Sequence, residues 1–173
     1  QKYFIYMRIY QKGDKKLLNA WAFYDWANSV YPLVISTAIF PIYYGFITES
    51  NKYIEFLGFN FKNTALISFV TAFAFLILVI ITPILSGIAD YTGMKKKFMK
   101  FFCFMGSIAT ISLYWFDIDN LTLGLVYYLF AMIGFWGSLV FYNSYLPEIA
   151  FENQQDSVSA KGYSLGYFGS VIL

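Results

Sequence analysis

Residues 63–89 read NTALISFVTAFAFLILVIITPILSGIA, 27 consecutive residues without a charged side chain between Lys62 and Asp90. A helix rises about 1.5 Å per residue, so roughly 20 apolar residues cross a hydrocarbon core about 30 Å thick. The segment must be helical in lipid, because the open edges of a strand find no hydrogen-bond partners there. The run therefore predicts a membrane-spanning helix over residues 64–88.

Three further intervals between charged residues predict spans of the same kind. They hold 23, 16 and 28 uncharged residues, and the shortest suffices if Lys100 extends its ammonium group back to the headgroups. A shorter apolar run then ends the sequence and predicts the start of a fifth span. The expected fold class is an all-α membrane protein, one helical domain over residues 1–173, with four complete spans and the start of a fifth: 17–47, 64–88, 98–116, 121–146 and 161–173.

Composition agrees with the bilayer as the main partner of the chain. Hydrophobic residues make up 59% of the sequence and charged residues 13%, whereas a soluble domain carries about 25% charged residues. The net charge of +2 gives no reason to expect nucleic acid as a partner. With no histidine and Cys103 as the single cysteine, neither a disulfide framework nor a His/Cys metal site has ligands, and no cofactor is expected.

The basic residues are distributed unevenly between the two sides that alternating spans define. Two of them, Lys52 and Lys62, fall on one side, and ten fall on the side of the N-terminus. These ten are Lys2, Arg8, Lys12, Lys15, Lys16, Lys95, Lys96, Lys97, Lys100 and Lys161. Because cytoplasmic loops carry an excess of lysine and arginine, the asymmetry predicts a cytoplasmic N-terminus.

Asp25 begins a polar stripe in the first span that continues at helical spacing through Asn28, Ser29 and Pro32. If the span starts near Leu17, Asp25 lies roughly 12 Å along its axis. Such a carboxylate costs about 2.5 to 3.5 kcal/mol in hydrocarbon and normally faces a partner or a wet cavity. It could carry a coupling proton or meet a substrate amine. Alternatively, the span starts at Trp26 and Asp25 only caps its N-terminus.

Prolines and small residues give further structural predictions. Pro32 and Pro41 each remove a backbone donor from the first span and predict a broken or kinked helix, a feature that often lines transport cavities. Small residues at near four-residue spacing predict close helix packing. They are Gly134, Ser138, Gly162, Gly166 and Gly169.

Asn143 and Glu148 form a second polar cluster, near the predicted cytoplasmic end of the fourth span. Asn143 is a cavity candidate. Glu148 could join a salt-bridge network with Lys95 to Lys97 on the same side, or remain an exposed carboxylate worth little to stability.

Residues 86–97, SGIADYTGMKKK, connect the second and third predicted spans. Gly87 permits close helix approach, Asp90 can cap a helix or pair with a cation, and Gly93 can adopt a positive φ. The segment resembles the signature loop of the major facilitator superfamily, which it matches at Asp90, Gly93 and Lys95. Ser86, Tyr91 and Met94 stand where that pattern has a glycine and two basic residues. The resemblance implies a gating loop made by Gly87, Asp90, Gly93 and Lys95.

Three more segments narrow the resemblance. They are NAWAFYDWANSVYPLVISTAIFPIYY at 19–44, FYNSYLPEIA at 141–150 and DSVSAKGYSLGYFGS at 156–170. Together they resemble the major facilitator branch of the autophagy-related vacuolar amino-acid effluxers and their bacterial relatives. The resemblance implies part of an N-terminal six-helix bundle, completed by a C-terminal half of the same protein. It also implies alternating-access transport of a small solute, amino acids among the candidates, with a coupling proton, in a bacterial inner membrane.

Two other functions are compatible with the sequence: an integral-membrane enzyme and a membrane scaffold that transports nothing. An enzyme would need clustered carboxylates, histidine ligands or an activated nucleophile. The sequence offers isolated carboxylates and no histidine, so we expect no enzyme. A full gene with about twelve spans would favour the transporter, since such folds repeat their first half in their second.

Overall fold

The computed structural model describes residues 11–172, which separate into two compact units. Of the described residues, 11–30 and 144–172 form the smaller unit, and 31–143 form the larger. Lys2 and Arg8, which entered the charge asymmetry, lie outside the described residues. The described chain has four helices that are long and apolar enough to cross a membrane: Lys15–Thr48, Asn63–Thr92, Lys95–Trp115 and Ile118–Ile149. The prediction of an all-α membrane fold with four complete spans is confirmed.

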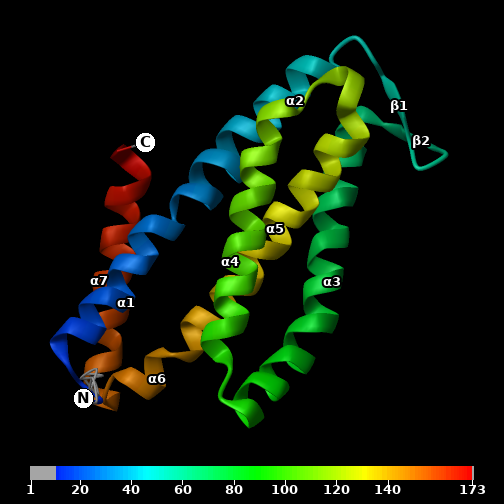
Figure 1. The fold of residues 1–173 in the computed structure, drawn as a ribbon. Coiled ribbons are helices and arrows are strands. Elements are labelled where there is room, and N and C mark those ends of the chain that lie inside the picture. Colours follow the sequence, from blue (N-terminus) through cyan, green and yellow to red (C-terminus); the bar gives the residue numbers. More distant parts are fainter. Residues whose placement is uncertain (1–10, 173) are drawn as a thin grey trace, which may run out of the picture. The chain divides into compact units, whose positions relative to one another are not determined.

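In the smaller unit, α1 (Lys15–Asn28) packs along α7 (Glu152–Ile172), and the short α6 (Leu146–Ile149) precedes α7 (Figure 1). The side chain of Asp14 accepts a hydrogen bond from the Lys16 backbone and caps α1. The helix ends at Asn28 because Pro32, four residues on, has no N–H to donate to the Asn28 carbonyl.

The helix α7 begins at Glu152, well before the predicted membrane segment at 161–173. A charge-free interval marks only the part of a helix that can lie in hydrocarbon. The helix itself can begin earlier, because charged turns outside the lipid can also be helical. The side chain of Gln154 accepts a hydrogen bond from the Phe151 backbone at 3.1 Å, which closes the start of α7 in the manner of a capping box. The fifth span stays a prediction.

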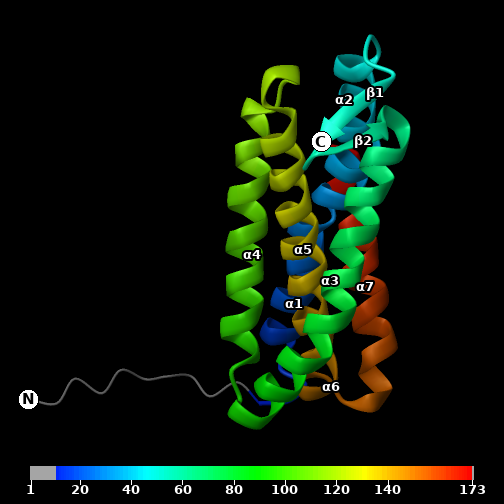
Figure 2. The ribbon, with the colours of Figure 1, turned by 90° about the vertical axis from the view of Figure 1, so that its right-hand side faces the viewer.

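The larger unit opens with a π-helix, η1 (Tyr31–Ile39), followed by α2 (Phe40–Thr48). The predicted break of the first span is therefore present, with Pro32 in the π segment and Pro41 in the first turn of α2. The long helices α3 (Asn63–Thr92), α4 (Lys95–Ser112) and α5 (Leu121–Ser144) run beside one another (Figures 1 and 2). Two 3-10 turns, η2 (Leu113–Trp115) and η3 (Ile118–Asn120), connect α4 to α5.

Aromatic rings and glycines set the packing of the larger unit. The Phe40 ring stacks on Tyr128 with centroids 4.0 Å apart and on Phe116 at 5.2 Å. Gly124 makes room for Phe116, since a Cβ on that glycine would overlap the ring. Gly134 lies against the backbone of Gly106, so α4 and α5 approach closely there, as the small-residue spacing predicts.

A β-hairpin, which we did not predict, connects α2 to α3. Strands β1 (Tyr53–Phe56) and β2 (Phe59–Lys62) pair antiparallel. The hairpin is anchored at its base, where the Tyr44 hydroxyl donates to the Asn63 carbonyl at 2.8 Å and the Asn63 amide donates to the Thr48 carbonyl at 3.2 Å. Charge-free intervals reveal only segments long enough to cross a membrane, so they give no sign of strands of four residues.

Candidate functional site

Asp25 lies within α1, on the side of that helix that faces α7. A Cβ on Gly166 would come 3.3 Å from Asp25 Oδ2 and closer still to Ser29 Oγ. The partly buried carboxylate therefore faces α7 at a position where α7 has no side chain. Because α1 begins at Lys15 with its cap at Asp14, the alternative that Asp25 caps the first helix is wrong.

Hydrogen bonds join the backbone around Asp25 to α7. Ser29 Oγ donates to the Asp25 carbonyl at 2.8 Å. Ser170 Oγ, on α7, lies 3.2 Å from the Ser29 carbonyl and 3.0 Å from the Gly166 carbonyl, so its hydroxyl is shared between the two helices. The Asp25 carboxylate itself has no hydrogen bond and no ion pair with any residue from 11 to 172. This leaves an unpaired acidic group in a helix contact whose serine hydroxyls are hydrogen-bonded.

Gly169 brings α7 closest to the point where α1 ends. A Cβ on this glycine would lie 2.5 Å from the Trp26 carbonyl oxygen and 2.9 Å from the indole ring of the same residue. Only a glycine fits such a contact with backbone without displacing one helix. Gly162 and Gly166 are buried along the same face of α7. The predicted small-residue stripe of α7 is therefore its contact with α1.

The π segment after α1 holds a buried hydroxyl that the sequence analysis missed. The Tyr31 hydroxyl has no hydrogen-bond partner within residues 11–172, while its ring packs on Phe135 with centroids 5.0 Å apart. An unpaired buried hydroxyl costs about 1–3 kcal/mol. The Thr37 hydroxyl, by contrast, donates to the Pro32 carbonyl at 2.6 Å. In the sequence, only the position of Tyr31 next to the polar stripe could have marked it as a candidate site residue.

The remaining polar candidates are divided between the units. Asn28 at the end of α1 and Ser29 just after it belong to the same unit as Asp25, whereas Pro32 and Asn143 belong to the larger unit. Asn143 is exposed near the end of α5. A cavity made jointly by these residues stays a prediction.

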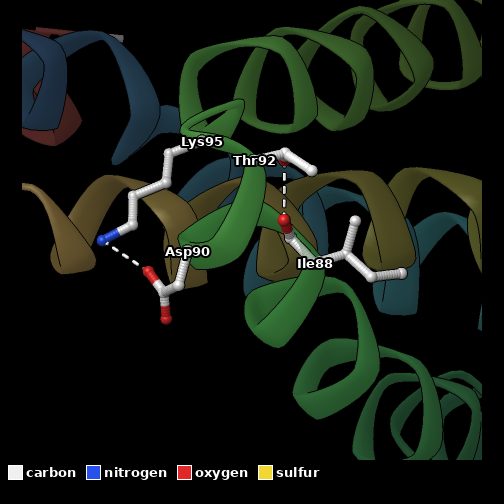
Figure 3. A network of polar contacts seen from close by, with 4 residues as sticks. All are labelled: Ile88, Asp90, Thr92 and Lys95. Atoms are coloured by element: carbon white, nitrogen blue, oxygen red, sulfur yellow. Dashed lines mark hydrogen bonds and ion pairs between the residues drawn. The ribbon is translucent and has the colours of Figure 1, made fainter.

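The turn between α3 and α4 contains a salt bridge (Figure 3). Lys95 Nζ lies 2.7 Å from Asp90 Oδ1, and the lysine side chain is the more buried of the two. Asp90 is in the last turn of α3, where a negative charge opposes the helix dipole, so the lysine offsets an unfavourable placement. The Thr92 hydroxyl donates to the Ile88 carbonyl at 2.6 Å in the same turn (Figure 3).

Gly93 makes this turn possible. It ends α3 with φ 68°, a left-handed conformation that glycine adopts at little cost, and its N–H bonds the Ala89 carbonyl. Asp90, Gly93 and Lys95 are thus brought together, as the signature-loop resemblance implies. The predicted close helix approach at Gly87 is not found among the described residues, since a Cβ there would meet nothing within 4 Å. Glu148 lies on α6 in the other unit, and its network with Lys95 to Lys97 stays a prediction.

These helices, the charge-paired turn and the carboxylate in the first span define part of a polytopic α-helical membrane protein. Residues 13–173 match the family described as vacuole effluxer Atg22 like. The chain belongs to this family, which confirms the resemblance found in its motifs.

Two bacterial relatives support the assignment. The chain is 39% identical over 162 residues to a protein of Bacillus subtilis (strain 168) named "Uncharacterized MFS-type transporter YxiO", covering 93% of this chain and 36% of the relative. It is 30% identical over 167 residues to an uncharacterized protein of Aquifex aeolicus (strain VF5), covering 95% of this chain and 38% of that protein. The chain thus spans little more than a third of either relative. No solved structure matches it significantly.

Proposed function

We propose that this chain is part of a secondary active transporter that moves small solutes across a membrane by alternating access. The family is that of a vacuole effluxer, and one relative is named an MFS-type transporter. In such folds solute binds near the membrane midplane between two halves of the protein, which rock to expose it to each side in turn. Since the chain spans about a third of its relatives, transport requires the rest of the protein.

The observation that carries the mechanism is the unpaired Asp25 carboxylate. It lies in the first span, against Gly166, with no cationic side chain bound to it among residues 11–172. A carboxylate in hydrocarbon gains most from neutralisation, by a proton or by a cationic ligand. We therefore assign Asp25 to proton coupling or to binding the amine of the solute. Amino acids, the solutes implied by the family resemblance, contain such an amine.

We place the Asp90–Lys95 turn at the cytoplasmic face of an inner membrane, on the basis of the lysine asymmetry. As a surface ion pair it is worth under about 1 kcal/mol to stability. Its role in transport is to form in one state and break in the other as the halves move. The small energy suits a contact that must break in every cycle.

The test is uptake by the full-length protein in proteoliposomes, with a panel of radiolabelled amino acids and an imposed pH gradient. Asp25→Asn should abolish gradient-driven accumulation, because the amide can neither carry the proton nor bind an amine by charge. Asp156→Asn is the matched control, since Asp156 is an exposed carboxylate on α7 of the same unit. It should transport as the unchanged protein does.

The possible results separate the parts of the proposal. Unchanged accumulation by Asp25→Asn would end the coupling role of this residue. Loss of accumulation with retained counterflow of solute across a vesicle without a gradient would assign Asp25 to the proton, and loss of both would assign it to the solute. Failure of the unchanged protein with every amino acid would refute the substrate class, and the second half alone showing full transport would refute the role of this chain.

A further inference from the structure

The β1–β2 hairpin has one apolar face that extends beyond the protein beneath it. Cross-strand partners share a face of the ribbon, so the pairs Ile54–Phe61 and Phe56–Phe59 place four apolar side chains on one side. The other side holds Tyr53, Glu55, Asn60 and Lys62. The hairpin is therefore amphipathic, although it is too short to have a core of its own.

Only part of the apolar face is covered. Ile54 and Phe56 are buried in the core of the larger unit, at 8% and 7% exposure, and Phe61 packs against the same core. Phe59 points to the same side as these residues but is 69% exposed. The outer end of the apolar face, at Phe59, is thus not covered by the larger unit.

The turn residue Leu57 is strained and exposed. It has φ 52°, and Gly58 follows with φ 81°, a turn that normally takes asparagine, aspartate or glycine at both positions. A leucine in this left-handed conformation costs about 1–2 kcal/mol. It is also 72% exposed, so the described residues cover little of the side chain. An apolar side chain held in this way indicates a contact outside the described chain.

The surroundings of the hairpin point to lipid. It projects beyond α3 at the end where that helix begins, which is one end of a helix long and apolar enough to cross a membrane (Figure 1). A row of aromatic rings leads from the hairpin along α3. The ring centroids of Phe61 and Phe69 are 5.2 Å apart, and those of Phe69 and Phe73 are 6.4 Å apart. Phe69 and Phe73 are exposed apolar rings on a helix of membrane-spanning length, as lipid-facing side chains are. Lys52 and Lys62 lie at the base of the hairpin, and lysines beside a membrane-spanning helix attract anionic lipid phosphates.

We propose that the β1–β2 hairpin is an interfacial anchor that inserts Leu57 and Phe59 among the lipid headgroups, on the side of the membrane opposite the Asp90–Lys95 turn. Its apolar face lies on the bilayer and its polar face, with Asn60 and Glu55, meets water. Lys52 and Lys62 contact lipid phosphates. The anchor fixes the depth of the adjoining ends of α2 and α3, and it is independent of what the protein transports.

The test compares two adjacent positions of β2 that face opposite ways. Phe59→Cys and Asn60→Cys are made in the full-length protein with its native cysteines, Cys103 included, replaced by serine, and each is labelled with an environment-sensitive fluorophore. Both side chains are exposed, so neither change removes a buried contact. The proteins are placed in vesicles of phosphatidylethanolamine and phosphatidylglycerol, with quenchers either attached to the upper acyl chain or dissolved in water.

The label at position 59 should emit further to the blue and be quenched by the lipid-attached quencher. The label at position 60 should be quenched by aqueous iodide instead. Equal iodide quenching at both positions would show a free loop and overturn the anchor. Protection of position 59 from both quenchers would overturn it too, since another part of the protein would then cover the tip.

Discussion

At the scale of single residues, the glycines of this chain are not equivalent. Gly134 and Gly106 meet backbone to backbone, and Gly169 meets the Trp26 carbonyl. Gly87 and Gly45, which are equally helical, face open space. Where membrane helices touch, small residues let the backbones approach and gain dispersion contacts over a long seam. The same residue type therefore fixes packing at some positions and leaves it unaffected at others.

Gly134→Ala should destabilise the protein, because its Cβ would overlap the backbone of Gly106, which cannot move aside as a flexible side chain can. Overpacking of this kind costs about 1–3 kcal/mol. Gly87→Ala is the matched control within the same unit and should be neutral or slightly stabilising, since alanine is the better helix former and has room. The measurement is the melting temperature of the full-length protein in detergent. Equal melting temperatures for the two variants would contradict the close contact of α4 and α5.

Some of the candidate residues could be predicted from sequence and others could not. An acidic residue at a fixed depth in an apolar run stands out, so Asp25 was found before the fold was known, and the fold then excluded its role as a cap. Tyr31 did not stand out, because tyrosines are frequent in this chain and most find a simple place at a membrane interface. What distinguishes Tyr31 is a missing hydrogen-bond partner, and this depends on its neighbours in space.

At the scale of elements, the first span is three helices in sequence rather than one. The π-helix Tyr31–Ile39 separates α1 from α2. Most π turns are single bulges, and they occur often at functional sites. Nine residues of this geometry leave a widened backbone beside the polar stripe. Such an element can change its hydrogen bonding by a register shift, which a straight helix cannot do without breaking.

Pro32→Ala should make the protein more stable and the transporter slower. Alanine supplies the N–H that proline lacks at position 32, which lets α1 continue, and an interior proline costs a helix about 3 kcal/mol or more. Pro41→Ala should change little, because Pro41 lies in the first turn of α2, where a missing N–H is tolerated. Melting temperature and uptake rate are measured for both variants. A Pro32→Ala protein that is less stable, or that transports at the original rate, would refute the functional role of the break.

The number of spans could be predicted because lipid imposes a minimum length on every charge-free interval. The π segment, the hairpin and the true start of α7 could not. A proline shows that a helix is disturbed, but neighbouring side chains decide between a kink and a π turn. The hairpin is too short to be a membrane span, so no minimum length distinguishes its strands from a loop. Its turn also lacks the usual sequence signal, because Leu57 stands where asparagine, aspartate or glycine is normal.

At the scale of the whole molecule, the asymmetry of charge should appear as a fixed orientation. Lys96→Cys and Asn60→Cys are both exposed, near opposite ends of α3. In intact cells a membrane-impermeant maleimide should label the cysteine at position 60 only, and permeabilised cells should be labelled at both positions. The positive-inside rule supplies the reason. The reverse pattern would invert the proposed topology while leaving the hairpin anchor on the opposite face from the lysines.

The pairing of α1 with α7 joins segments that are made at very different times. Ser29 and Ser170 share a hydrogen bond although 141 residues separate them. Ribosomes add about 5–20 residues per second, so roughly 7 to 30 s pass between the synthesis of the two helices. During that time the first span, with its acidic side chain, has entered the membrane and its partner does not yet exist. The helix to which we assign proton coupling or solute binding is therefore also the one that waits longest in the membrane for its partner.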